Sequence, residues 1–232
     1  GVFMQFDKLK NNRILPYFAI LPLISCWIWN MFMYYGSRMV NGGLKHYDMT
    51  TAFDLATPVI PETIIIYFGC FGTWVIYYIL CGRVDEKYTA KFVTFDILSR
   101  TICGIFFVLL PTCNIRPEIA GNGFFEKALL HLYATDAADN LFPSIHCLVS
   151  WNCFIGIRGL SVYKKRYKVL ACVIAILVFL STLYTKQHVV ADVYSAVIVS
   201  ELAWFVVNHT NFYLKVWKFF HALSNRVFRV NS

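Results

Sequence analysis

Residues 169–192 read VLACVIAILVFLSTLYTKQHVVAD, and this segment determines the fold class. Residues 169–184 carry no charge, and their length is close to the twenty residues or so that a helix needs to cross the hydrocarbon core. A short polar turn follows with Lys186 and His188, and apolar residues then resume around Asp192. Two apolar segments joined by a tight polar turn predict a hairpin of membrane-spanning helices.

The same pattern recurs along the chain and sets the fold class. Of the 232 residues, 58% are hydrophobic and only 15% are charged, which would expose too much apolar surface on a soluble domain. We expect an all-α, polytopic six-helix transmembrane bundle that forms a single integral-membrane domain over residues 1–232, with a catalytic core at about 54–207. The predicted spans are 14–35, 60–81, 92–110, 142–157, 169–184 and 189–207. The first lacks a small-residue cleavage pattern, so it is predicted to span the membrane rather than to be a removed signal peptide.

The remaining segments are predicted to be polar loops at residues 36–58 and 113–140, and a short amphipathic tail after Asn208. The eight cysteines lie mostly within apolar runs and lack metal-ligand spacing, so we interpret them as small buried hydrophobic residues. Cys113 is the expected exception because it borders a loop.

The distribution of Lys and Arg predicts the orientation. Under the positive-inside rule, both termini are cytoplasmic and the loops at 36–58, 113–140 and 185–188 face outward. The formal charge of +8 then faces anionic inner-leaflet headgroups, so no nucleic-acid partner is needed. We expect an integral membrane protein of the plasma membrane. Fifteen of the 21 basic residues share the cytoplasmic side: Lys8, Lys10, Arg13, Arg83, Lys87, Lys91, Arg158, Lys164, Lys165, Arg166, Lys168, Lys215, Lys218, Arg226 and Arg229.

Polar residues gather at two places on the outer side, Pro143-Ser-Ile-His146 and Ser181 through His188 to Asp192. His188 and Asp192 are four residues apart, so on a helix the carboxylate can accept one ring N–H and leave the other nitrogen as a nucleophile. His146 is then the candidate general acid for the leaving group. Two alternatives are a purely structural His–Asp pair and a metal site made of the same three residues.

Several residues are candidates to hold the substrate. Arg116 can grip two phosphate oxygens, and Lys186 stands two residues before the nucleophile. Ser144 and the free N–H groups of its helix form an anion site, and Ser181 can add a hydroxyl. Loop carboxylates at Asp136 and Asp139 are candidates to attract a cationic headgroup.

Two further groups of charges fall inside predicted spans. Asp96 and Arg100 have the spacing of an internal ion pair, and Glu201 must be either protonated or paired because a lone charge there is costly.

These motifs resemble the signatures of the type-2 phosphatidic acid phosphatase superfamily. Pro143-Ser-Ile-His146 is similar to its P-S-G-H signature, Ser181, His188 and Asp192 match the spacing of its third signature, and Arg116-Pro117 resembles the end of the first. Positions 109 and 182 hold Leu and Thr where the family usually has Lys and Arg. The surrounding residues, Thr185-Lys-Gln-His188 and Ile115-Arg-Pro-Glu118, are closer to the branch of inositol phosphorylceramide and sphingomyelin synthases. The resemblance implies a six-helix core, an outward-facing site and metal-independent chemistry without a cofactor.

We therefore expect a membrane enzyme that hydrolyses a lipid phosphate or diphosphate at the outer leaflet through a phosphohistidine on His188. The alternative within enzymes is transfer of a phospho-headgroup onto a lipid alcohol. From another class, a transporter with an anion-binding cavity has only Glu201 and His131 in its favour. The predicted partners are the lipid phosphate substrate and membrane lipids, and the sequence makes no prediction of oligomeric state.

Overall fold

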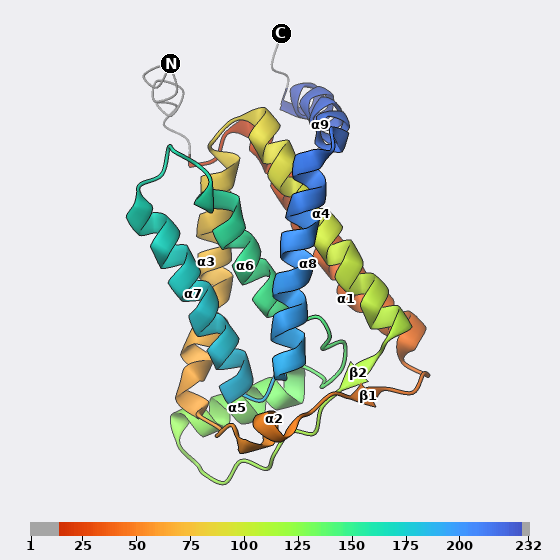
Figure 1. Cartoon of the computed structure of the whole chain (residues 1–232), viewed down its shortest axis with the longest axis vertical. Helices are drawn as coiled ribbons and strands as arrows, with labels where there is room; N and C mark the ends of the chain where they lie inside the picture. Colours follow the sequence, from red (N-terminus) through yellow and green to blue (C-terminus); the bar gives the residue numbers. More distant parts are fainter. Residues whose placement is uncertain (1–13, 229–232) are drawn as a thin grey trace.

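Helices occupy all six of the predicted apolar runs in the computed structural model, which describes residues 14–228 (Figure 1). The boundaries differ from the predicted ones by a few residues, mostly because polar residues at the ends extend the helices. The helices are α1 (Tyr17–Asn41), α3 (Ile64–Gly82), α4 (Glu86–Leu109), α6 (Ile145–Arg158), α7 (Lys165–Tyr184) and α8 (Val190–His209).

Five helical segments are long and apolar enough to cross a membrane, and they indicate an integral membrane protein. These are α1, α4, α7, α8 and the segment Pro61–Gly82, in which the short 3-10 helix η2 (Pro61–Thr63) precedes α3. The remaining predicted span, 142–157, corresponds to α6, which has only 14 residues. It contacts α3, α4, α7 and α8, and most of its side chains are buried. A helix surrounded by protein need not match the thickness of the bilayer, because its ends meet protein rather than lipid.

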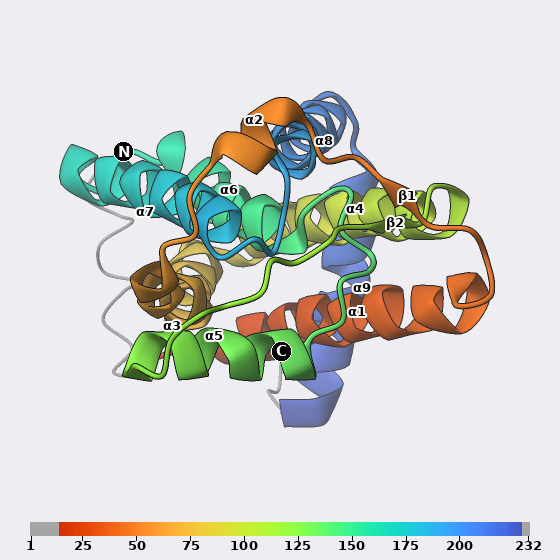
Figure 2. The same cartoon turned by 90° about the horizontal axis from the view of Figure 1, so that it is seen from below.

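The expected outer loops contain structure that the sequence analysis missed. Residues 36–58 complete α1 and then form the strand β1 (Tyr47–Asp48) and the one-turn helix α2 (Ala52–Ala56). Residues 113–140 include the helix α5 (Phe124–Thr135), while β2 (Thr112–Cys113) pairs in parallel with β1. Figure 2 shows α5 lying across one end of the bundle beside α3. Its buried Leu129 and Leu132 pack with Ile64 and Tyr67 of α3, so α5 covers this end.

The opposite end carries the basic connections and the amphipathic tail. The tail is the helix α9 (Phe212–Phe228), which packs against α4 and α1 (Figure 1). Trp217 on its inner side donates to Glu86, whereas Phe219 is exposed. The α3–α4 and α6–α7 connections lie at the same end as α9, as the alternating topology requires. Of the cations used to predict orientation, Lys8, Lys10, Arg13 and Arg229 lie outside the described residues.

A buried polar network joins α4 to its neighbours. Arg100 Nε lies 2.7 Å from Asp96 Oδ2, and the two side chains are 6% and 0% exposed. Tyr78 donates to Asp96, and Asn152 Nδ2 lies 3.0 Å from Asp96 Oδ1. The predicted internal ion pair is therefore confirmed.

Glu201 on α8 is also paired. Its two carboxylate oxygens accept from the Arg158 guanidinium at 2.6 and 2.7 Å, and Trp151 Nε1 adds a third bond at 2.9 Å. Arg158 ends α6, so this bidentate contact ties the short central helix to α8.

All eight cysteines are free, and six of them are buried, as predicted. Cys113 and Cys172 are partly exposed. Burial and the nearby Asp48 carboxylate raise the pKa of the Cys113 thiol, which keeps this exception protonated at neutral pH.

Candidate active site

Side chains from other parts of the chain form hydrogen bonds with the turn between α7 and α8. Tyr133 of α5 donates to the Thr185 carbonyl at 2.9 Å, and Asn114 donates to the Lys186 carbonyl at 3.0 Å. Lys186 itself has φ 52°, a left-handed conformation that a non-glycine residue adopts only when its surroundings hold it there. Burial raises the pKa of Tyr133 to about 12, so its hydroxyl remains a donor at physiological pH. These contacts fix the backbone just before His188.

His188 and Asp192 form the predicted pair. His188 Nδ1 lies 3.1 Å from Asp192 Oδ2, and the two side chains are 7% and 1% exposed. The same carboxylate oxygen accepts the Val189 backbone N–H at 3.0 Å and so caps the start of α8. Because an ionised carboxylate only accepts, the pair places the Nδ1 proton toward Asp192, and in the neutral ring the lone pair is then on Nε2.

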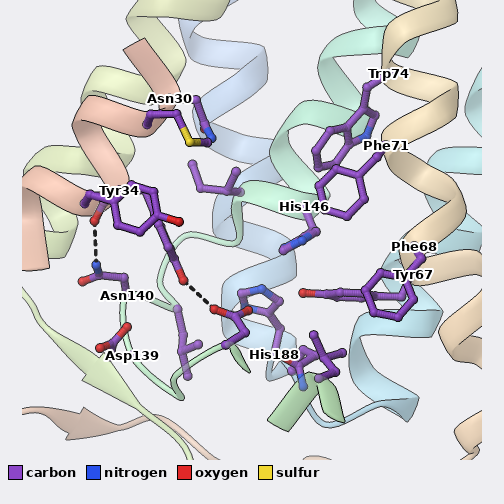
Figure 3. A pocket seen from close by; sticks show the side chains of 17 residues that line it. Asn30, Tyr34, Tyr67, Phe68, Phe71, Trp74, Asp139, Asn140, His146 and His188 are labelled. Atoms are coloured by element: carbon purple, nitrogen blue, oxygen red, sulfur yellow. Dashed lines mark hydrogen bonds between the residues drawn. The ribbon is translucent and has the colours of Figure 1, made fainter. Parts of the chain in front are cut away.

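His146 is the second residue of α6, and it meets His188 across a cavity (Figure 3). The two ring centroids are 5.9 Å apart. His146 also packs against Tyr67, with 4.5 Å between ring centroids, and against Phe71 and Trp74. The three residues predicted to carry the chemistry are thus brought together by α6, the α7–α8 turn and α8.

The cavity has a volume of about 260 Å³, and both histidines line it. Its walls come from α1, α3, the end of α5, the segment 136–146 and the α7–α8 turn. No Lys or Arg is among the described residues that line it, whereas Asp136 and Asp139 are. Three tyrosines, Tyr34, Tyr35 and Tyr67, share the lining. The cavity is therefore aromatic and acidic rather than basic.

The two carboxylates face α1. Asp136 Oδ1 accepts from the Tyr34 hydroxyl at 2.7 Å, and Asp139 Oδ1 accepts from Arg38 Nε at 2.8 Å. Arg38 Nη2 lies 2.6 Å from Asp139 and 3.6 Å from Asp136, so one cation is shared by two anions. This end of the cavity keeps an excess of negative charge. Tyr34 and Arg38 were missed because α1 precedes the predicted catalytic core at 54–207, and no motif marks their contact with residues 100 positions away.

Arg116 is close to the site but does not line the cavity. Its Nη1 donates to the carbonyls of Asp136 at 2.6 Å and Tyr133 at 3.2 Å, and its Nη2 donates to Gln187 Oε1 at 2.8 Å. The guanidinium thus links the C-terminal end of α5 to the residue before His188. Phosphate binding by Arg116 stays a prediction. In the structure, its contacts hold the end of α5 against the α7–α8 turn.

Lys186 is directed to α2. Its Nζ donates to the carbonyls of Asp54 at 2.5 Å and Thr57 at 2.6 Å. Burial lowers the pKa of this ammonium group, although the neighbouring Asp54 partly offsets the shift. Lys186 lines a second cavity of about 410 Å³, which also touches His188, but it does not line the first.

Both candidate serines form hydrogen bonds with the backbone of their own helices. Ser144 is the N-cap of α6, where its fully buried Oγ accepts from Cys147 N at 3.2 Å. Ser181 Oγ donates to the Val178 carbonyl at 2.8 Å, and it is also fully buried. Neither side chain lines the cavity between the histidines.

Residues 14–228 contain no cluster of three or more His, Cys, Asp or Glu side chains arranged to hold a metal ion. Comparisons with protein-family models, with curated proteins and with solved structures found no match to this chain. The likeness to the type-2 phosphatidic acid phosphatase superfamily therefore remains a hypothesis carried by the motifs alone.

Proposed function

We propose that the chain is a metal-independent membrane enzyme that transfers the phosphoryl group of a lipid through a covalent phosphohistidine on His188. The observation that carries the proposal is the pairing of His188 with Asp192 at 3.1 Å, opposite a second histidine in the same cavity. A nucleophile oriented by a third group, together with a nearby acid, is the arrangement that covalent catalysis needs.

In the first half-reaction, His188 Nε2 attacks phosphorus and a P–N bond forms. The P–O bond to the lipid alcohol breaks, and His146 gives its proton to the departing alkoxide. In the second half, His146 takes a proton from water or from an acceptor alcohol, whose oxygen attacks phosphorus while the P–N bond breaks. Both histidines return to their starting protonation states, so the cycle is balanced.

The leading expectation from the sequence is hydrolysis of a lipid phosphate or diphosphate. The charges of the cavity favour the second candidate, transfer of a phospho-headgroup from a lipid phosphodiester. A dianionic monoester would meet Asp136 and Asp139 with no Lys or Arg lining the cavity, because Arg38 is paired with those carboxylates and Arg116 and Lys186 are bound to backbone carbonyls. A phosphodiester carries one negative charge, and a cationic headgroup can lie against the two carboxylates and Tyr34.

The test is a substrate panel on the purified protein. Lipid monophosphates and diphosphates are compared with zwitterionic phosphodiesters of equal chain length, each with and without diacylglycerol or ceramide. We expect the zwitterionic diester to be consumed fastest and the headgroup to appear on the acceptor lipid. Faster release of inorganic phosphate from the monoester would favour the phosphatase. If no substrate is consumed, the proposal is wrong.

We also propose that the end of the bundle with α2 and α5 faces outward at the plasma membrane, because the basic connections lie at the other end. Ser161 and Asn122 are exposed and stand at opposite ends. In a cysteine-depleted background, an impermeant thiol reagent added to intact cells should label Asn122→Cys and spare Ser161→Cys. The reverse labelling would put the site on the inner face.

A further inference from the structure

Asn30 on α1 lines the cavity that contains His146 and His188. It lies one helical turn before Tyr34, so the two side chains share a face of α1. Figure 3 shows Asn30 and Trp74 toward the upper end of the view and Asp139, Asn140 and His188 toward the lower end, with His146 at a height between them. Asn30 therefore belongs to the end away from the carboxylates.

The orientation of the Asn30 amide is set by Arg100. Arg100 Nη1 donates to Asn30 Oδ1, and a guanidinium has no acceptor with which to satisfy the opposite orientation. Arg100 is itself held, because its Nε lies 2.7 Å from Asp96 and its Nη2 lies 2.8 Å from the Tyr78 hydroxyl. The oxygen of Asn30 is thus directed to the buried network, and Nδ2 offers its two N–H groups elsewhere. No described residue accepts a hydrogen bond from Nδ2.

Apolar side chains share the lining of the cavity with Asn30. Met31, Phe71, Trp74 and Ile145 are among them. An amide donor among apolar side chains favours a ligand that brings an acceptor, since leaving the donor unpaired on burial costs about 1–3 kcal/mol. Under the proposed function the lipid part of the substrate enters this end, because His146, which would protonate the lipid alkoxide, packs against Phe71 and Trp74.

We propose that Asn30 is a recognition residue that donates a hydrogen bond to the linkage carbonyl of an acylated lipid. Glycerolipid esters and sphingolipid amides carry this carbonyl a few bonds from phosphorus, whereas ether lipids and isoprenoid phosphates lack it. Asn30 thereby selects acylated substrates. The inference rests on the proposed function, and it adds a substrate class that the histidines alone do not specify.

The test uses two phosphodiester lipids with the same cationic headgroup and chain length, one diacyl and one dialkyl. On wild-type protein, kcat/KM for the diacyl lipid should exceed that for the dialkyl lipid by about 3- to 10-fold, the worth of one net hydrogen bond. Asn30→Asp keeps an oxygen for Arg100 and removes both N–H donors, so the diacyl-to-dialkyl ratio should fall to about 1. Asn208→Asp, an exposed change on α8, should leave the ratio at the wild-type value.

The ratio is insensitive to partial misfolding, which lowers both rates together. Equal rates on the two lipids by wild-type protein would overturn the assignment without any variant. An unchanged preference in Asn30→Asp would overturn it as well, while leaving the proposed function standing. If wild-type protein consumes neither lipid nor the other members of the substrate panel, the proposed function and this inference are both wrong.

Discussion

Two buried hydrogen-bonded pairs in this chain have the same four-residue spacing, Asp96 with Arg100 and His188 with Asp192. Sequence spacing cannot distinguish them. The first pair is closed: Arg100 also bonds Tyr78 and Asn30, and Asp96 accepts from Asn152. Its polar groups are matched to protein partners, which is the condition under which a charge can be buried.

The second pair is open. His188 borders a cavity on each of two sides, and its Nε2 keeps a lone pair. The buried Asp192 Oδ1 has no hydrogen-bond partner among the described residues. A polar group left unmatched in a native structure requires an explanation, and a catalytic role is one. The surroundings of a pair, rather than its spacing, therefore separate a structural pair from a reactive one.

The largest expected effect is on the open pair. His188→Ala should lower kcat by at least about 10⁴-fold and abolish the phosphoenzyme, because the proposed P–N bond forms on the His188 ring. Rapid quenching with labelled substrate measures the covalent intermediate. The exposed His209 provides the matched control, and His209→Ala should retain wild-type turnover. Acid-labile phosphate at wild-type levels on His188→Ala protein would assign the nucleophile elsewhere.

His146→Ala should have the next largest effect. Loss of the proton donor should slow phosphoenzyme formation by about 10²- to 10⁴-fold on a natural lipid alcohol. A substrate with an acidic phenol as leaving group needs less protonation, so the deficit should shrink on it. Equal deficits on both substrates, measured in single-turnover reactions, would remove His146 from the role of general acid.

On the closed pair, the expected loss is in stability. Asp96→Ala leaves Arg100 as an uncompensated buried cation, and breaking such a pair typically costs about 3–5 kcal/mol. Unfolding of the detergent-solubilised protein, followed by tryptophan fluorescence, measures this loss. His209→Ala, a change at an exposed position, serves as the comparison and should unfold close to wild type. A destabilisation below about 1 kcal/mol in Asp96→Ala would show that the closed network is not structural.

The sequence predicted the parts of this comparison that depend on local pattern. Hydropathy located the helices, since a span needs a continuous apolar run. The four-residue spacing predicted both pairs, and the alternation of helices predicted that His146 and His188 lie at the same end. The cost of a lone intramembrane charge predicts that Glu201 is either protonated or paired, and the structure shows the pairing, with Arg158 as the partner that the sequence does not identify.

The contacts that the sequence does not predict join segments that are distant in the chain. Arg116 and Lys186 bind backbone carbonyls, which every residue possesses and no sequence motif marks. The sequence pattern predicts a loop where α5 forms, because the apolar face of this helix is short and becomes buried only against α3. The contribution of α1 to the cavity depends on packing between segments about 100 residues apart, as in the Tyr34–Asp136 contact.

The smallest expected effect comes from removing metal ions. If the open pair were a metal site, His146, His188 and Asp192 would have to supply at least three ligands. His188 Nδ1 is already bonded to Asp192 Oδ2, which leaves one free nitrogen on His188 and a carboxylate turned toward that ring rather than toward His146. The proposed substrate is a zwitterionic diester whose charge is balanced by its own headgroup and the two loop carboxylates, so its binding needs no added cation. Dialysis against a chelator should therefore change kcat/KM by less than about twofold, within the precision expected of such assays and well below the 10²-fold scale of acid catalysis. Loss of activity that one divalent metal restores at one equivalent per chain would show that the open pair is a metal site.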